Sequence, residues 1–445
     1  MDLLNKVRDA GVIGAGGAGF PTHAKLTSRA EYILLNGAEC EPLLRVDQQL
    51  MEQFPDEIIH GLDAAGRYIR ARKAIIGIKG KHKKIINLLH TRIRALGLAD
   101  YMEVMELRDI YPAGDEQVLV YELTQRIVPE AAIPLKVGCV VINVETSLNI
   151  YYALTGHAVT ETYITIAGDI PHPLTLKVPV GVPIEDVIRQ CGVENIADYA
   201  VIDGGPMMGS VLKNLQGYVT KKSKGYVLLK KDHFLIRKKS VGPEQARILS
   251  KTACEQCRMC TDLCPRYLLG HNIQPHKIMR ALNYNLADVK ERQIAQLCCE
   301  CNACELFSCP ANLHPKAVNV LVKEKLTEQG LRYQPVQGEF QARSFRDYRL
   351  IPSKRLIARI GLSAYDKPAP LTQARLRSEY TGIALGQHIG APALPVVAVG
   401  EQVKAGQLIG KIPGNSLGAA VHASLDGTVT EITGNFIVIK VGSYV

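Results

Sequence analysis

Residues 254–310 read Cys254-x-x-Cys257-x-x-Cys260-x-x-x-Cys264-Pro265 and then, with 33 residues between Cys264 and Cys298, Cys298-x-x-Cys301-x-x-Cys304-x-x-x-x-Cys309-Pro310. Three cysteines at two-residue gaps can hold three corners of a cubane, and a fourth cysteine followed by proline ligates the other cluster of a pair. The spacing therefore predicts two 4Fe-4S clusters. The predicted ligands are Cys254, Cys257, Cys260 and Cys309 for cluster I, and Cys298, Cys301, Cys304 and Cys264 for cluster II.

Two other uses of these cysteines are disfavoured. Tetrahedral zinc has no use for a third and fourth thiolate in such tight runs, and a disulfide framework belongs to oxidising compartments. Cys299 adjoins Cys298, but only one residue separates it from Cys301, so Cys298 is preferred as the ligand. We interpret Cys40, Cys139 and Cys191 as core residues, and His271, His276 and His314 as loop residues rather than ligands.

The length and charge of the chain set broad limits on its class. Its 445 residues correspond to about three domains. No run reaches the ~18 apolar residues of a membrane helix, and no signal-peptide pattern opens the chain, so we expect a cytoplasmic protein without a membrane span. The formal charge of +10 could suit nucleic acid, but the basic residues are scattered and anionic cofactors would lower the charge. We expect no nucleic-acid partner.

A glycine-rich loop lies near the start of the chain. It reads Gly14-Ala15-Gly16-Gly17-Ala18-Gly19-Phe20-Pro21. The loop contains G-x-G-x-x-G, with Glu39 twenty residues beyond Gly19, as in a Rossmann fingerprint. However, a helix over residues 2–10 is expected before it, and Pro21 stands where the next helix should run. The fingerprint is therefore not assigned, although such a loop can close on a phosphate or a flat ring.

From this loop onward the sequence resembles the NADH-oxidising flavoprotein subunit of respiratory complex I and the C subunit of the Rnf electron-transport complex. The shared segments are the loop itself, Asn36-Gly-Ala-Glu39-Cys40-Glu41-Pro42, Tyr111-Pro-Ala-Gly114-Asp115-Glu116 and Asn143-Val-Glu145-Thr146. The resemblance implies an FMN site that is served by NADH. The residues it assigns to these two ligands are Gly14, Gly16, Gly17, Lys25, Asn36, Glu39, Glu41, Gly114, Glu116, Asn143 and Thr146.

The chemistry of these residues agrees with the resemblance. Lys25 can donate to flavin oxygens or phosphate, and the two asparagines offer amide donors and acceptors. Each glutamate alone would be read as a surface carboxylate, but together they are candidates for ribose or nicotinamide contacts. The sequence departs from complex I at Ala15, Ala38 and Thr27-Ser28, which replace an arginine, an aspartate and an aromatic stretch. These departures concern NADH more than FMN.

The rest of the chain divides by composition. Residues 161–220 carry short alternating strands around one helix and resemble the ubiquitin-like β-grasp, soluble-ligand-binding domain of the same family. Residues 221–243 are basic and poorly periodic, which indicates a linker. Residues 244–333 hold the cysteines with apolar residues at helical spacing between the runs, which favours an α-helical ferredoxin domain. Residues 334–380, polar and punctuated by proline, indicate a connector.

The final segment, residues 381–445, is rich in strands and punctuated by glycine. It resembles a lipoyl- or biotinyl-type barrel-sandwich hybrid. A carrier domain of that type needs a lysine at the hairpin tip, and Pro413-Gly-Asn-Ser-Leu-Gly-Ala-Ala420 has none. We therefore expect a docking module without a cofactor. In the Rnf complex a similar module lies at the N-terminus of the C subunit, so the order is permuted here.

The predicted whole is an α/β multidomain protein that begins with a Rossmann-like FMN- and NADH-binding domain at residues 1–160. This domain order resembles the cobalamin reductase family of propanediol-utilisation microcompartments. The resemblance implies electron transfer from NADH to cob(III)alamin and cob(II)alamin, supplying cob(I)alamin to an adenosyltransferase beside a microcompartment shell protein. No side chain is predicted to be catalytic, because the cofactors relay the electrons. The alternatives are an Rnf-like entry subunit that reduces ferredoxin or quinone, and a non-catalytic electron relay.

Overall fold

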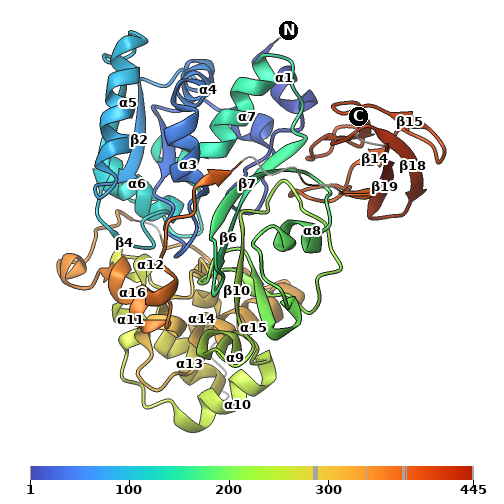
Figure 1. Cartoon of the computed structure of the whole chain (residues 1–445). Helices are drawn as coiled ribbons and strands as arrows, with labels where there is room; N and C mark the ends of the chain where they lie inside the picture. Colours follow the sequence, from blue (N-terminus) through green and yellow to red (C-terminus); the bar gives the residue numbers. More distant parts are fainter. Residues whose placement is uncertain (1, 284–288, 337, 373–375, 377, 443–445) are drawn as a thin grey trace.

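The computed structural model describes residues 2–283, 289–336, 338–372, 376 and 378–442. Figure 1 shows an N-terminal α/β module, a central mixed sheet, a helical module that contains the cysteine runs, and a small C-terminal barrel. The cysteine module lies at the opposite end of the molecule from helix α1 (Leu3–Asp9), whereas the barrel lies beside the central sheet. The helix expected over residues 2–10 is confirmed as α1.

The N-terminal module is a parallel sheet covered on both faces. Its strand order is β3-β2-β1-β5. Because successive side chains of a strand alternate, Ile33 and Leu35 belong to the core that contains α4, α5 and α7, whereas Leu34 belongs to the core that contains α6. The bounds are β1 (Tyr32–Gly37), β2 (Lys73–Lys79), β3 (Met102–Leu107), β5 (Cys139–Asn143), α2 (Thr22–Lys25), α3 (Val46–Gln53), α4 (Pro55–Tyr68), α5 (Lys83–Ala95), α6 (Glu116–Thr124) and α7 (Val144–Leu154).

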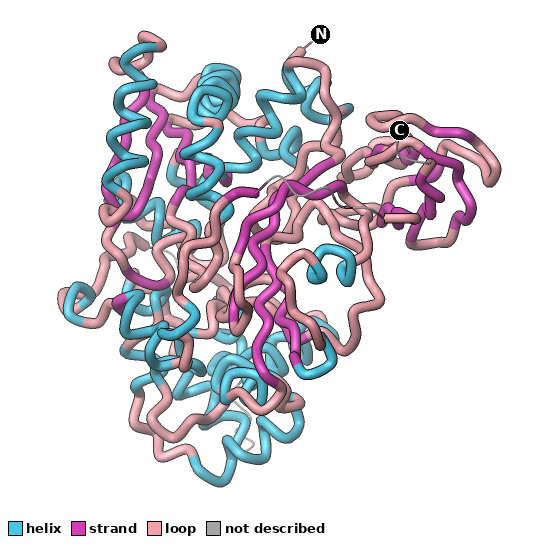
Figure 2. Tube along the Cα trace, in the orientation of Figure 1, coloured by secondary structure: helices cyan, strands magenta, loops and turns pink. Residues whose placement is uncertain are grey.

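The central sheet has six strands in the order β12-β7-β6-β10-β8-β9. β6 and β7 form an antiparallel hairpin, β10 runs parallel to β6, and the short helix α8 covers one face. The magenta strands at the centre of Figure 2 belong to this sheet. The bounds are β6 (Glu161–Gly168), β7 (Leu174–Pro179), α8 (Ile184–Arg189), β8 (Tyr199–Asp203), β9 (Ser210–Val211) and β10 (Gly225–Lys230).

The structure corrects the predicted linker at residues 221–243. Gly225–Lys230 forms β10 between β6 and β8, and its Tyr226 is fully buried. Helix α9 (Phe234–Lys239) follows and packs Leu235 into a core shared with the cysteine module. The many lysines around these short apolar runs hid the strand and the helix from a periodicity argument.

The cysteine module is built from helices, as the spacing between the two runs predicted. Cys254 follows α10, and α15 closes the module after the second cysteine run. The core around α13 and α15 includes Ile278 and Val318. The bounds are α10 (Pro243–Ala253), α11 (Met259–Asp262), α12 (Pro265–Leu268), α13 (Pro275–Asn283), α14 (Val289–Gln293), a 3-10 turn (Ile294–Leu297), a π-helical turn (Cys304–Ser308) and α15 (Pro315–Glu328).

Residues 334–380, predicted as a connector, contribute one strand to a separate two-stranded sheet and one to the central sheet. β11 (Ile351–Pro352) pairs with β4 (Ile110–Tyr111), helix α16 (Ser353–Arg359) follows, and β12 (Leu371–Thr372) pairs with β7. Strands of two residues have no detectable period, which is why the sequence did not reveal them.

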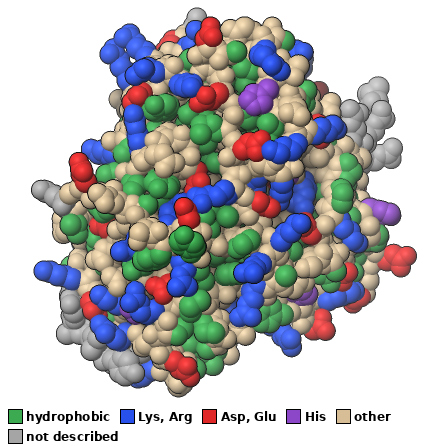
Figure 3. Space-filling view, turned by 90° about the vertical axis from the view of Figure 1, so that its left-hand side faces the viewer, with side chains coloured by type: hydrophobic (Ala, Val, Ile, Leu, Met, Phe, Trp, Pro, Cys, Tyr) green, Lys and Arg blue, Asp and Glu red, His purple; other side chains and the backbone are tan. Residues whose placement is uncertain are grey.

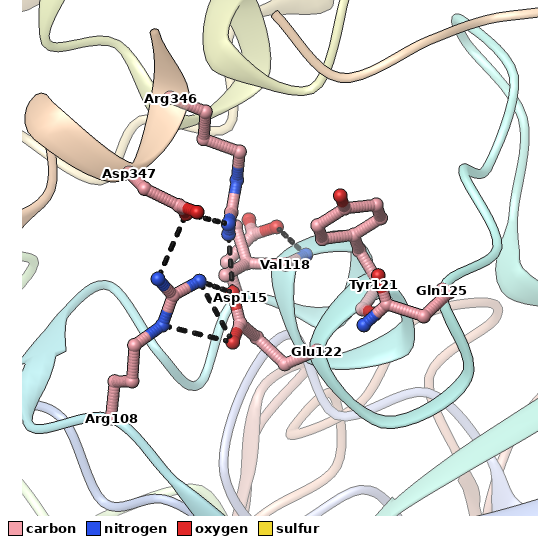
Figure 4. Close-up of polar contacts among 8 residues, drawn as sticks. All are labelled: Arg108, Asp115, Val118, Tyr121, Glu122, Gln125, Arg346 and Asp347. Atoms are coloured by element: carbon pink, nitrogen blue, oxygen red, sulfur yellow. Dashed lines mark hydrogen bonds and ion pairs between the residues drawn. The ribbon is translucent and has the colours of Figure 1, made fainter. Parts of the chain in front are cut away.

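A buried ionic group fixes this connector to the N-terminal module (Figure 4). Arg346, 4% exposed, pairs with Glu122 of α6, and its guanidinium lies 4.7 Å from the centre of the Tyr121 ring. Arg108 bridges Glu122 and Asp347, at 2.8 Å from each. The Arg346–Glu122 and Arg108–Asp347 pairs join residues more than 200 positions apart.

The C-terminal barrel consists of two small antiparallel sheets around a shared core. One has the order β13-β19-β18-β15 and the other β14-β16-β17. Its predicted range ends at residue 445, and residues 443–445 lie outside the described part of the chain. The bounds are β13 (Tyr380–Ala384), β14 (Leu394–Pro395), β15 (Gln402–Val403), β16 (Leu408–Lys411), β17 (Val421–His422), β18 (Gly427–Ile432) and β19 (Phe436–Val441).

The surface shows mixed charge. On the face in Figure 3, Lys and Arg side chains are interspersed with Asp and Glu. Among the helices of the described residues, none has the length and apolar character needed to cross a membrane.

Candidate flavin and iron-sulfur sites

The carboxyl ends of β1 and β5 form the centre of the first candidate site. β2 and β3 lie on one side of β1, whereas β5 pairs with its other side. In open α/β sheets, ligands bind outside the strand ends where the strand order reverses in this way. Asn36 and Asn143 are register partners at this edge. The two asparagines predicted for the flavin are therefore brought together.

Both asparagines are held by the surrounding backbone. Asn36 Nδ2 donates to the Gly114 carbonyl at 2.9 Å, and its Oδ1 accepts from the Ala38 N–H at 3.3 Å. Asn143 caps α7, because its Oδ1 accepts from the Glu145 N–H at 2.9 Å. Gly114, on the predicted segment Tyr111–Glu116, thus joins the same group.

The glycine loop lies against the start of α7. The Ala15 N–H donates to the Thr146 hydroxyl oxygen at 3.0 Å. A Cβ on Gly16 would lie 2.9 Å from Asn143 Nδ2, so a larger residue there would displace the Asn143 amide, whereas a Cβ on Gly17 would meet no atom within 4 Å. Open space beside backbone N–H groups and the N-terminus of the 11-residue helix α7 suits the phosphate of FMN.

Lys25 and Glu116 form an ion pair near this edge. Lys25 Nζ lies 3.0 Å from Glu116 Oε1 and donates to the Val141 carbonyl of β5 at 2.6 Å. Both side chains are partly exposed. The ammonium group of the predicted lysine is thus held at β5, and because the side chain is partly exposed it can also contact a ligand at this edge.

A cluster of buried and half-buried acids adjoins the site, and of these sequence reasoning had assigned only Glu39 to a ligand. Glu39 accepts from the Asp47 N–H at 2.9 Å, and Asp47 accepts from Asn143 Nδ2 at 2.9 Å. Glu145, 1% exposed, pairs with Lys224, the residue before β10. Burial and then the charge of Asp47 raise the pKa of Glu39 to about 7, and burial also raises the pKa of Asp47 and of Glu145. These groups come from separate segments, so no local spacing signalled the cluster.

Glu41 connects the N-terminal module to the central sheet. Its carboxylate accepts from the backbone N–H groups of Met207 and Met208 at 2.8 Å and 2.7 Å. Burial raises the pKa of Glu41. In the structure this predicted NADH contact binds protein backbone, and no sequence signal pointed to that partner.

The two cysteine runs fold into equivalent turns. Gln256 and Arg258 have positive φ angles of 56° and 68°, and Glu300 and Asn302 have 59° and 65°. These residues stand two and four positions after Cys254 and after Cys298. The equivalence supports Cys298, rather than Cys299, as the counterpart of Cys254.

The four thiols predicted for cluster II line one cavity. It is bounded by Cys264, Cys298, Cys301 and Cys304, and also by Cys299 and Asn319. The Glu300 N–H points to Cys298 Sγ at 3.4 Å, and Asn319 Nδ2 lies 3.7 Å from the same sulfur. Donors directed at sulfur are the usual surroundings of iron-sulfur thiolates, so these residues fit a cluster.

The thiols predicted for cluster I also gather. Burial raises the pKa of Cys260 to about 12, and Cys254, Cys309 and Cys257 add to the rise because they lie nearby. The Leu313 N–H donates to Cys309 Sγ at 3.3 Å. Within the described ranges, no three His, Cys, Asp or Glu side chains converge on a point suited to one metal ion.

The histidines beside the cysteine runs bind protein groups. His271 Nε2 lies 2.9 Å from the Val128 carbonyl, and His276 Nδ1 lies 2.7 Å from Thr261 Oγ1. His314 Nδ1 lies 3.1 Å from Glu305 Oε1.

Two contacts join the flavin-side residues to the cluster II residues. The Tyr111 hydroxyl donates to the Cys301 carbonyl, and both residues belong to one apolar core. Arg266, two residues after Cys264, forms an ion pair of 2.8 Å with Asp115, and both side chains are nearly buried. Asp115 also caps α6 by accepting from the Val118 N–H at 3.1 Å (Figure 4). The two candidate sites therefore adjoin each other.

Three protein families match successive parts of the chain. Residues 7–152 match the Nuo51 FMN-binding domain, residues 253–314 match a 4Fe-4S dicluster domain, and residues 364–442 match the RnfC barrel sandwich hybrid domain. The last match begins before the predicted boundary at residue 381.

Whole-chain comparisons find relatives with the same extent. The chain is 43% identical to the cobalamin reductase PduS of Citrobacter freundii, covering 97% of this chain and 94% of that protein. It is 41% identical to the PduS of Salmonella typhimurium, covering 99% and 97%. The C subunit of the Na(+)-translocating ferredoxin:NAD(+) oxidoreductase complex of Acetobacterium woodii is 35% identical, covering 61% of this chain and 60% of that protein.

The fold is also found among solved structures. An NAD+-reducing [NiFe]-hydrogenase in the H2-reduced state matches with a TM-score of 0.50 and 21% sequence identity, covering 78% of this chain and 65% of that chain. This likeness concerns the fold alone.

Proposed function

The chain belongs to the cobalamin reductase PduS family, and from that membership we propose that it uses NADH to reduce cob(III)alamin and cob(II)alamin and so supplies cob(I)alamin for adenosylation. The protein is a flavin and iron-sulfur oxidoreductase. When bound, FMN accepts electrons in pairs and releases them singly, and 4Fe-4S clusters carry them singly.

The proposed FMN site uses the residues at the ends of β1 and β5. The open backbone at Gly17 and the first turn of α7 at Thr146 would receive the phosphate. Asn36 would face the flavin, Asn143 would lie at its phosphate and ribityl end, and Lys25 would donate to flavin oxygens or phosphate. We assign NADH to the same edge, where Glu116 is partly exposed.

The proposed clusters have the ligand sets predicted from spacing. Cluster I takes Cys254, Cys257, Cys260 and Cys309, and cluster II takes Cys298, Cys301, Cys304 and Cys264. Support comes from the cavity that the four cluster II thiols line and from the repeated turn geometry. We propose that the helices that hold them form an α-helical ferredoxin domain and that the strands β7-β6-β10-β8-β9 around α8 form a β-grasp domain; the strand order and the helical build support this.

One observation carries the proposal. The carbonyl of Cys301, a residue assigned to cluster II, accepts a hydrogen bond from the hydroxyl of Tyr111. Tyr111 begins the segment that contains Gly114. Arg266 and Asp115 make a second buried link between the same two regions. A flavin at the strand ends and a cluster within the Cys301 loop would therefore lie in adjoining parts of one core, as electron transfer between them requires.

The partners and location follow from family membership. We propose that the cob(I)alamin product passes to an adenosyltransferase, and that the protein works in the cytoplasm within a microcompartment, where it contacts a shell protein.

An anaerobic assay tests the proposal. The reconstituted protein is mixed with NADH and either cob(III)alamin or an oxidised ferredoxin, and reduction of the acceptor is followed by absorbance. We expect cobalamin to be reduced at a rate proportional to the FMN content. No cobalamin reduction by a protein that contains FMN and both clusters would contradict the proposal.

The likeness to the ferredoxin:NAD(+) oxidoreductase protein favours one rival function. In that case the protein would exchange electrons with ferredoxin and leave cobalamin oxidised. A protein without flavin absorbance would instead act as a non-catalytic relay. The same assay therefore separates the three functions.

A further inference from the structure

The C-terminal barrel contacts the base of the glycine loop. Figure 1 shows the barrel on the same side of the molecule as α1, which leads into this loop. The Ile389 N–H donates to the Gly19 carbonyl at 3.1 Å. A Cβ on Gly19 would lie 3.1 Å from the Gln387 carbonyl oxygen, and the φ angle there is +74°. One end of the loop is therefore built against the barrel.

Lys221 holds the segment before the loop. Its side chain is 3% exposed, and its Nζ donates to the Gly11 carbonyl at 2.7 Å and to the Ala420 carbonyl at 3.0 Å. Gly11 precedes the loop, whereas Ala420 belongs to the barrel. A Cβ on Gly11 would lie 2.3 Å from the Ala420 oxygen, so the two backbones are in direct contact.

Gln387 fixes Lys221 in turn. Its Oε1 accepts from the Lys221 N–H at 2.8 Å, and its Nε2 donates to the Ala384 carbonyl of β13 at 3.1 Å. Gln387 is 2% exposed. A chain of hydrogen bonds thus runs from the barrel through Gln387 and Lys221 to Gly11, just before the loop. The Ile389 N–H binds Gly19 at the far end of the loop.

We propose that Lys221 and Gln387 are positioning residues for the flavin, which they serve by fixing the glycine loop against the C-terminal barrel. The inference rests on the proposed FMN site. It gives the barrel a role in cofactor retention, in addition to the docking role that its lack of a carrier lysine suggested.

The physical reason lies in the composition of the loop. A segment with four glycines in six residues loses much conformational entropy when it closes on a ligand. Bonds that already hold both ends reduce the entropy that remains to be lost on binding. Without them, the N–H groups near Gly17 would be directed less uniformly at a phosphate.

FMN affinity tests the inference without a turnover assay. The full-length protein with its clusters reconstituted is titrated with FMN, and the quenching of flavin fluorescence gives the Kd. We expect Lys221→Met to raise the Kd roughly tenfold, because two buried bonds to carbonyls are lost, and Gln387→Leu to raise it in the same direction. Iron content and the circular dichroism spectrum should stay as in the wild type.

Lys238→Met is the matched control. Lys238 is 7% exposed and also donates to two backbone carbonyls, those of Asn312 and Leu313, but it lies on α9 and contacts the cysteine module. Its substitution should leave the FMN Kd within about twofold of the wild type, as expected of a distant site.

Three results would overturn the inference. The first is an unchanged FMN Kd in folded Lys221→Met and Gln387→Leu, with Gln387→Leu deciding alone if the lysine variant does not fold. The second is an equal weakening by Lys238→Met. The third is a wild type that takes up no FMN, which would refute the proposed function as well. Normal FMN binding without cobalamin reduction would refute the proposed function only.

Discussion

The hydroxyl of Tyr111 donates a hydrogen bond to the backbone carbonyl of Cys301, which ties the N-terminal module to the turn that carries the proposed cluster II ligands. Burial raises the pKa of Tyr111 well above its usual value, so the hydroxyl keeps its proton. Tyr111→Phe would leave a buried carbonyl without this donor. We expect a loss of about 1–3 kcal/mol of stability and a changed EPR line shape for cluster II only.

The measurements are thermal unfolding and low-temperature EPR of the dithionite-reduced protein. Tyr348→Phe is the control, because that side chain is 88% exposed. An unchanged cluster II signal in Tyr111→Phe would show that the bond does not support the turn.

The ligand assignment predicts selective loss of clusters. Cys260→Ala should abolish the EPR signal of cluster I and Cys304→Ala that of cluster II, each removing about half of the iron. Cys299→Ala should leave both signals, because the turn geometry pairs Cys298 with Cys254. If Cys299→Ala removed one cluster while Cys298→Ala did not, the assignment of Cys298 would be wrong.

Removing the charge of one partner from the buried pair Asp115–Arg266 should lower the free energy of unfolding more than the same change in an exposed ion pair. Asp115→Asn keeps a side chain that can cap α6, but it leaves the nearly buried Arg266 without its counter-charge. We expect a cost of about 3–5 kcal/mol. The control is Asp262→Asn, which disrupts a more exposed pair of 3.4 Å with Arg258 and should cost under about 1 kcal/mol. Equal shifts in unfolding temperature for the two variants would contradict this ranking.

The sequence predicted those parts of the molecule that local spacing encodes. The helix at the N-terminus lies where it was expected, and the cysteine module is built from helices, as its periodicity indicated. The cysteine runs repeat the same turns because the spacing of their residues repeats. In each case the signal lies within about ten neighbouring residues.

Long-range contacts escaped prediction for the same reason. Lys224 pairs with Glu145 across 79 positions, and Glu41 binds the backbone of Met207 across 166 positions. β10 was taken for a linker because lysines flank a short apolar run whose burial depends on strands β6 and β8. No local pattern records such partners, since they are set by how the modules pack.

The raised pKa of Glu39 predicts that stability depends on pH between about 4.5 and 7. Burial and the charge of Asp47 raise this pKa from 4.5 to about 7, although Arg45 opposes the rise. The folded state therefore holds the proton more tightly than the unfolded state does. The stabilisation is complete below about pH 4.5 and is lost as the pH rises through 7.

For the protein without FMN, we expect the free energy of unfolding to fall by about 2 kcal/mol from pH 5 to pH 7 through this group. In Glu39→Gln the decrease in the free energy of unfolding between pH 5 and pH 7 should be smaller. Part of the decrease should remain, because the pKa values of Asp47 and Glu145 are also raised. The control is Glu324→Gln on an exposed position of α15. Unfolding temperatures at pH 5, 6, 7 and 8 give the slopes, and parallel curves for wild type and Glu39→Gln would rule out a proton held by Glu39.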